Sequence, residues 1–134
     1  MNIGKVAKIS GISAKMIRYY EDIGLIERPI RTDAGYRVYT EQDIQSLKFI
    51  RHSRDLGFST EQMKELIHLW KNKDRHSIEV KQLTQQHIDT LNQKIVDLQT
   101  MVNTLQQSVN GCAGNAEAEC EILNQIEFGA ASCK

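Results

Sequence analysis

Apolar residues recur at helical spacing along most of the chain, and one short stretch interrupts this pattern. Helix caps are expected at Asn2, Ser13, Thr40 and Ser59, because each is a small polar residue that precedes an apolar face with spacings of three and four residues. A much longer helix is expected over residues 77–110, which contain neither glycine nor proline. The pattern therefore predicts a mainly α protein.

The interruption lies between Leu25 and Tyr39, where the pattern changes from helical to extended. This stretch holds the only proline, Pro29, and the turn-like sequence Thr32-Asp33-Ala34-Gly35, with apolar or aromatic residues on both sides. Such a run predicts a small β-hairpin.

The first two helices are separated by a turn at Gly11, as in a helix-turn-helix motif. On the second helix, Met16, Tyr20 and Ile23 are expected to face inward. The opposite face then presents four residues: Lys15, Arg18, Tyr19 and Asp22. A basic and aromatic face of this kind suits a recognition helix in a major groove. An ordinary helical hairpin with a solvated basic face is the alternative.

The hairpin follows this helix directly, which favours its interpretation as a DNA-binding wing. Its donors suited to phosphate oxygens are Arg28, Arg31, Tyr36, Arg37 and Tyr39. A solvated hairpin that only covers the core is the alternative. The full set of expected DNA contacts is Lys15, Arg18, Tyr19, Arg31, Tyr36, Arg37 and Arg54. Among these, Lys15 and Arg18 are the better candidates for base edges.

Charge divides the chain into two parts, although the formal net charge is zero. Residues 1–75 hold 14 Lys and Arg against 10 Asp and Glu, whereas residues 76–134 hold 3 against 7. A basic front part suggests a nucleic-acid-binding module joined to a part with another task. The expected organisation is a winged helix-turn-helix domain at 1–75, a dimerisation helix at 76–110, and a metal-binding loop with a short helix at 111–134.

The long helix carries a narrow apolar stripe with alternating spacings of three and four residues: Ile88, Leu91, Ile95, Leu98, Val102, Leu105 and Val109. These positions span about three heptads of the a/d pattern of a coiled coil. So narrow a stripe does not stabilise an isolated helix in water, and the helix therefore needs a partner. A second copy of the chain is the expected partner. Packing against the front domain is the alternative.

Two cysteines near the end of the chain, Cys112 and Cys120, enclose a loop of seven mostly small residues. Two thiolates are soft ligands, which suit monovalent d¹⁰ ions such as Cu(I). Zn(II) fits less well, because structural zinc sites use four ligands and no histidine lies in the loop. A metal site, a reversible disulfide and two incidental thiols remain open as interpretations. The spacing assigns no role to Cys133.

Other classes of protein are disfavoured. No apolar run approaches the roughly 20 residues of a membrane span, and the first residues lack the apolar core of a signal peptide. A cytoplasmic protein is therefore expected. The chain has no Gly-rich phosphate loop, no histidine pair at metal-binding spacing and no Ser/His/Asp arrangement, so an enzyme is not expected.

Four stretches of the sequence together resemble one known family. They are residues 6–25, with Ile17-Arg18-Tyr19-Tyr20-Glu21; the hairpin sequence Gly35-Tyr36-Arg37-Val38-Tyr39; Arg75-His76-Ser77; and the pair Cys112 and Cys120. The whole chain resembles the MerR family of transcription regulators. Within this family it is similar to the copper-efflux (CueR-like) regulators, which the last two stretches indicate.

This resemblance implies a homodimer whose long helices pair antiparallel. Ser77 of one subunit would then border the metal site of the other without binding the ion, whereas family sensors of divalent metals carry a cysteine there. The resemblance also implies a two-fold-symmetric operator in double-stranded DNA and RNA polymerase as a partner at the promoter. The metal-bound dimer would distort the operator and activate transcription. Cu(I) is the implied metal, and Ag(I) and Au(I) are alternative ions.

On this interpretation, closing the cysteine loop docks the short helix after Cys120 against the dimer through Ile122 and Ile126. Two other functions remain open. A thiol redox regulator would use the same front half and oxidise Cys112 and Cys120 to a disulfide. A copper carrier would bind metal without preferring an operator, and the winged front half disfavours it.

Overall fold

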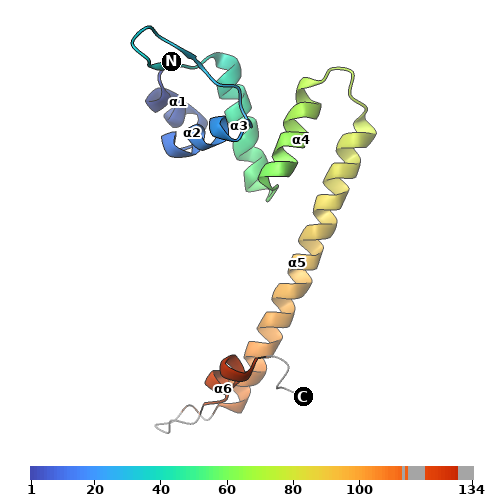
Figure 1. Ribbon diagram of the computed structural model, residues 1–134. Helices are drawn as coiled ribbons and strands as arrows, with labels where there is room; N and C mark the ends of the chain where they lie inside the picture. Colours follow the sequence, from blue (N-terminus) through green and yellow to red (C-terminus); the bar gives the residue numbers. More distant parts are fainter. Residues whose placement is uncertain (113, 115–119, 130–134) are drawn as a thin grey trace. The chain divides into compact units, whose positions relative to one another are not determined.

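The computed structural model describes residues 1–112, 114 and 120–129 (Figure 1). The chain divides into two compact units, Met1–Thr84 and Gln85–Lys134. The elements of the first unit are α1 (Ile3–Ser10), α2 (Ala14–Asp22), β1 (Ile30–Arg31), β2 (Arg37–Val38), α3 (Glu41–Asp55) and α4 (Thr60–Lys71). The long helix α5 (Ser77–Gly111) runs from the first unit into the second, and α6 (Glu121–Phe128) follows it.

The expected caps begin the first four helices. Asn2 and Ser13 each accept a hydrogen bond from the backbone N–H three residues later, at 2.9 and 3.2 Å. Thr40 and Ser59 each form a reciprocal capping box at the start of α3 and α4. Gly11 ends α1 in the left-handed conformation, with φ of 73°. The predicted helix-turn-helix is therefore confirmed.

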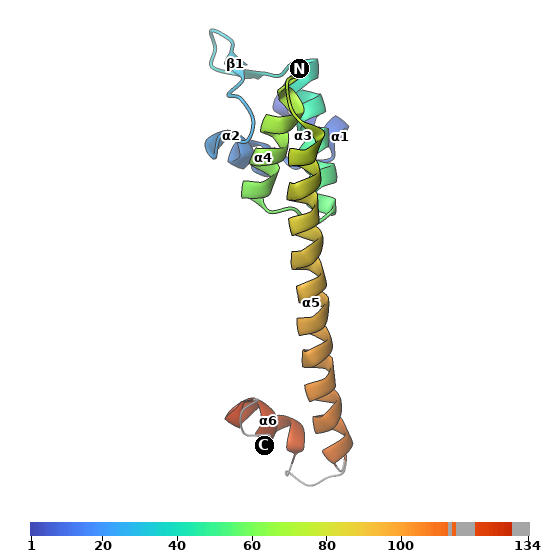
Figure 2. The same cartoon turned by 90° about the vertical axis from the view of Figure 1, so that its right-hand side faces the viewer.

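The core of the first unit lies among its four helices and the segment that follows α2. α1 packs against α2 and α3, and α3 packs against α4 (Figure 2). The residues of this core cluster are Val6, Ile12, Ile17, Tyr20, Leu25, Ile26, Tyr39, Ile44, Leu47, Ile50, Met63 and Ile67. The predicted inner face of α2 is confirmed, since Tyr20 is buried and Met16 and Ile23 are half-buried against the core. Ile17, which is fully buried beside them, was not predicted.

The expected β-hairpin is present and projects from the helices of the first unit. Its two strands are antiparallel, with Ile30 opposite Val38 and Arg31 opposite Arg37. The turn closes through two backbone hydrogen bonds of 2.8 Å, from Thr32 N–H to the Tyr36 carbonyl and from Gly35 N–H to the Thr32 carbonyl.

Tyr39, just after the hairpin, lies in the core and is 3% exposed. The expectation that it donates to a DNA phosphate is therefore wrong. An extended chain turns successive side chains to opposite sides, so Tyr39 points inward while Val38 is exposed.

The apolar stripe of α5 is exposed along the second unit. Five of its residues are at least half exposed: Ile95, Leu98, Val102, Leu105 and Val109. Among the described helices, none is long and apolar enough to cross a membrane. α5 ends at Gly111, one residue after the expected end, and α6 begins close beside it. A Cβ on Gly111 would lie 3.2 Å from Cγ of Glu121.

Replacing Gly11 by alanine should lower the free energy of unfolding by about 1–2 kcal/mol, because an L side chain is strained in the left-handed conformation. The added Cβ would also meet the guanidinium of Arg51. Gly4→Ala is the matched control. Gly4 lies inside α1, and a Cβ there has its nearest neighbour, Oδ1 of Asn2, at 3.6 Å.

Gly4→Ala should therefore stabilise the protein by up to about 1 kcal/mol, as alanine does inside a helix. Urea unfolding of the two variants measures the difference. Equal effects of the two substitutions would contradict the assigned turn.

Candidate functional site

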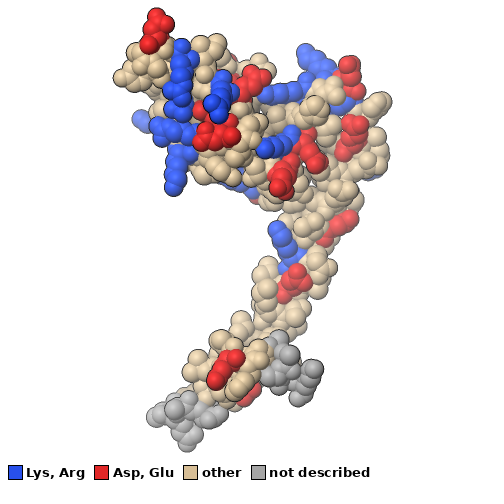
Figure 3. All heavy atoms as spheres, in the orientation of Figure 1, with Lys and Arg blue, Asp and Glu red and all other residues tan. Residues whose placement is uncertain are grey.

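The outer face of α2 carries the three residues predicted to enter a DNA groove. Lys15, Arg18 and Tyr19 are all exposed, and their spacing of three and four residues places them on one side of the helix. Most Lys and Arg side chains visible in Figure 3 lie on the first unit. The burial of Ile17 and Tyr20 on the opposite side fixes which face is presented.

The predicted contacts outside α2 are also at the surface, with one exception. Arg31 and Tyr36 are exposed on the hairpin, and Arg54 is exposed in the last turn of α3. The Arg31 guanidinium donates from Nη1 to the Gly35 carbonyl at 3.0 Å, which holds it along the turn. These side chains offer donors suited to phosphate oxygens.

Arg37 is the exception. Its side chain is 23% exposed, and its Nε lies 3.1 Å from Oε2 of Glu21 in an ion pair. Arg37 and Tyr36 are consecutive on an extended chain, so they point to opposite sides of the hairpin. Both were predicted to contact DNA, and the structure turns the exposed Tyr36 and the ion-paired Arg37 to opposite sides of the hairpin.

Glu21 is a residue that the sequence analysis missed. It is 5% exposed, and its second carboxylate oxygen, Oε1, accepts a hydrogen bond from the Tyr39 hydroxyl. Burial raises the pKa of the Tyr39 phenol, and the Glu21 carboxylate raises it further. Tyr39 therefore remains a protonated donor at neutral pH. The signal was present in the spacing, since Glu21 lies four residues after Ile17 and shares its inner face.

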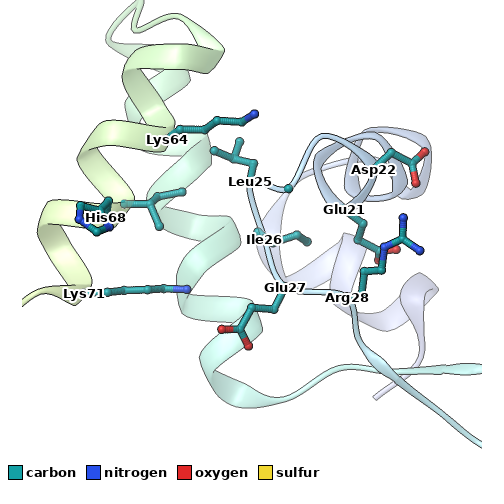
Figure 4. Close-up of a pocket in the computed structure, with 11 residues that line it drawn as sticks. Glu21, Asp22, Leu25, Ile26, Glu27, Arg28, Lys64, His68 and Lys71 are labelled. Atoms are coloured by element: carbon teal, nitrogen blue, oxygen red, sulfur yellow. The ribbon is translucent and has the colours of Figure 1, made fainter.

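A groove of about 580 Å³ lies between α4 and the segment after α2 (Figure 4). Its apolar lining comes from Leu25, Ile26 and Ile67. Lys64 and Lys71 extend from α4 toward the segment after α2, which carries Glu27 and Arg28. Its lining residues all belong to the first unit.

The two predicted metal ligands lie together at the junction of α5 and α6. Cys112 directly follows α5, and Cys120 is the N-cap residue of α6. Their Sγ atoms are 3.5 Å apart, and one thiol donates to the other sulfur. Both side chains are half-buried. They are free thiols, because a disulfide would bring the sulfurs to about 2.05 Å.

The first turn of α6 acts on the Cys120 sulfur. The backbone N–H of Leu123 lowers the pKa of the Cys120 thiol, and the Cys112 thiol and the Ile122 N–H lower it further. Burial and the Glu121 carboxylate oppose this shift. A lowered pKa favours the thiolate, which is the form that binds metals and reacts with oxidants.

Within the described ranges, no three His, Cys, Asp or Glu side chains form a group that could hold a metal ion. Ser77, expected beside the metal site of a partner subunit, is the first residue of α5. Cys133 lies outside the described residues.

Comparison with known proteins agrees with this architecture. Residues 1–69 match the MerR HTH family regulatory protein model, and residues 44–108 match the model described as MerR, DNA binding. The transcriptional regulator HmrR of Sinorhizobium medicae is 46% identical over 134 residues, which is 100% of this chain and 91% of that protein. The transcriptional regulator CueR of Escherichia coli O6:H1 is 40% identical, over 94% of this chain and 93% of that protein.

A solved structure has the same architecture. It is the regulator PbrR691 of Ralstonia metallidurans in complex with lead(II), with a TM-score of 0.82 and 28% identity. The match covers 94% of this chain and 98% of that one. The expected resemblance to the MerR family, with CueR among its relatives, is confirmed. The chain belongs to the MerR family of helix-turn-helix, DNA-binding transcription regulators.

Proposed function

We propose that this protein is a Cu(I)-responsive transcription activator in which Cys112 and Cys120 hold the ion. Ag(I) and Au(I) are alternative ions of the same charge. The observation that carries the proposal is the reduced thiol pair, with its sulfurs 3.5 Å apart and no third donor grouped with it in the described part of the chain. Regulators named for heavy metals are among the relatives of this chain, which supports a metal as the signal.

The donor set favours a monovalent ion. Two thiolates suit Cu(I), whereas structural Zn(II) sites use four protein ligands and catalytic sites use three. The family resemblance implies that sensors of divalent metals carry a cysteine, and so a third thiolate, at the position of Ser77. A serine there agrees with a monovalent ion. The lowered pKa of Cys120 supports metal binding near neutral pH. A thiol binds metal only after it loses its proton, and a lower pKa raises the fraction that has lost it.

A dimer is part of the proposal because the stripe of α5 needs a partner. An isolated helix with half-exposed isoleucine, leucine and valine side chains leaves apolar area in water that pairing would remove. A two-fold dimer would present two copies of α2 to the two halves of a symmetric operator. RNA polymerase at the promoter is then the partner that responds to the distorted DNA.

The short helix α6 is the proposed link between metal and DNA. Ile122 is half-buried and Ile126 is 67% exposed, so α6 presents an apolar face to dock against the dimer. Distorting an operator of this size costs on the order of 1–6 kcal/mol. Metal must therefore favour the distorting conformer by a few kcal/mol, since a ligand shifts an equilibrium only by its differential affinity.

The same thiol pair supports a second candidate, a redox-sensing regulator. A peroxide would take two electrons and two protons from the thiols, and a Cys112–Cys120 disulfide and water would form. The lowered pKa of Cys120 favours this reaction as it favours metal binding. A measurement that separates metal from oxidant decides between the two.

Anaerobic competition titration of the reduced protein should show tight binding of one Cu(I) per chain. Cys112→Ser and Cys120→Ser should each weaken binding more than about a hundredfold, because each removes one of two ligands. Cys133→Ser is the matched control and should bind as the wild type does, and Zn(II) should bind weakly. Binding indifferent to the first two substitutions, with a DNA response to peroxide in the absence of metal, would favour the redox function.

Replacing both Ile122 and Ile126 by asparagine should keep Cu(I) binding and abolish promoter activation, because the ligands remain and the docking face is lost. Activation is measured with a reporter whose promoter carries an operator selected by the wild-type protein. Glu127→Gln on the same helix is the control and should activate normally. Full activation by the double variant would refute docking through α6.

Leu98→Asp should convert the protein from dimer to monomer, because it places a charge in the paired stripe. Removing a buried leucine costs about 2–5 kcal/mol, and the loss occurs in both subunits. Gln99→Asp, next to it but off the stripe, should remain dimeric. Sedimentation equilibrium measures both, and a dimeric Leu98→Asp variant would show that the stripe is not the interface.

A further inference from the structure

Glu21 is the only carboxylate in the described part of the chain that is buried. Both of its oxygens have partners: Oε2 accepts from Arg37 Nε at 3.1 Å, and Oε1 accepts from the Tyr39 hydroxyl. A buried carboxylate is costly unless it is paired and hydrogen-bonded. Burial of Glu21 in the core therefore depends on these two partners.

Both partners come from the hairpin. Arg37 lies in β2, and Tyr39 follows two residues later, so both side chains face the same side of the extended chain. The backbone of Tyr39 is held as well, because its N–H donates to the Met1 carbonyl at 2.9 Å. The base of the hairpin is thus fastened to α2, while its turn extends away from the helices.

The pairing also offsets a repulsion within the hairpin. Arg31 lies directly opposite Arg37, and like charges at opposed positions destabilise a strand pair. Glu21 supplies a counter-charge to Arg37, while Arg31 turns to the Gly35 carbonyl. Without Glu21, the Arg37 guanidinium would lose its fixed direction.

We propose that Glu21 is a positioning residue for DNA binding, which fixes Arg37 and the base of the hairpin in register with the recognition helix α2. Glu21 uses only Nε of Arg37. The other four N–H donors of the guanidinium lie on its two Nη atoms and suit a phosphate. The inference rests on the DNA-binding role of the first unit and is independent of metal sensing.

Two neighbouring carboxylates on α2 provide the test. Glu21→Gln and Asp22→Asn remove the same charge from the same helix, but Asp22 is exposed. If charge alone mattered, both variants would bind DNA more tightly, because each removes a carboxylate that repels the DNA phosphates. If Glu21 positions Arg37, only Glu21→Gln binds more weakly.

The probe is a duplex of about 30 base pairs, selected by the wild-type protein from a random library and titrated at several salt concentrations. Glu21→Gln should bind about tenfold more weakly, and its salt slope should fall by about 1, because one phosphate contact is lost. Asp22→Asn should bind as tightly as the wild type or more tightly, with an unchanged slope.

Arg37→Ala provides the double-mutant cycle. It should lower affinity and salt slope by amounts similar to Glu21→Gln, and combining the two should add nothing, because both act on one contact. Additive losses would overturn the proposal, and so would a Glu21→Gln variant with wild-type affinity and slope. A wild-type protein that selects no duplex would instead refute DNA binding itself.

Thermal unfolding of each variant shows whether it is folded at the titration temperature. If Glu21→Gln is unfolded there, Arg37→Lys is tested instead. Lysine keeps the charge but lacks the Nε–H that donates to Glu21. Arg37→Lys should then lose affinity as Arg37→Ala does. Wild-type affinity of this variant would overturn the proposal.

Discussion

The inner face of α2 is the constraint on which the DNA-binding half depends. Ile17, Tyr20 and Glu21 follow one another at helical spacing and are all buried. Their burial leaves the opposite side of the helix, with its basic and aromatic residues, to face solvent. A carboxylate in this position must also find donors, and Arg37 and Tyr39 supply them from the hairpin. One buried face therefore determines both what the helix presents and where the hairpin is attached.

The long helix α5 follows a different logic, because local contacts rather than a core support most of its length. Four hydrogen bonds link side chains one turn apart: Gln85 to Asp89, Gln93 to Asp97, Gln99 to Asn103 and Gln106 to Asn110. Such pairs contribute only about 0.2–0.5 kcal/mol each. They cannot compensate for an apolar stripe left in water, so the helix depends on a second surface. In the proposed dimer that surface is the same stripe of another copy.

Local signals explain how far the sequence predicted this structure. Caps such as Thr40, the turn at Gly11 and the hairpin after α2 each depend on a few neighbouring residues, and all are present. The partners of Glu21 lie 16 and 18 positions later in the chain. Neither helical nor strand spacing predicts contacts between residues so far apart. The thiol pair was predicted as ligands from its chemistry. Its proximity results from the return of α6 beside the end of α5.

The position of the thiol pair bears on how so small a site would act on DNA. Cys112 and Cys120 belong to the two sides of the junction between α5 and α6, so an ion held by both would limit how α6 moves against α5. In the proposed mechanism, the free energy for distorting an operator comes from this restriction, since a ligand shifts an equilibrium only by its differential affinity for the two states. Linkage makes the effect reciprocal: whatever factor the ion adds to the distorted complex, the distorted operator adds to the affinity for the ion. A sensor of this design therefore binds its metal most tightly when it already holds the promoter in the active form.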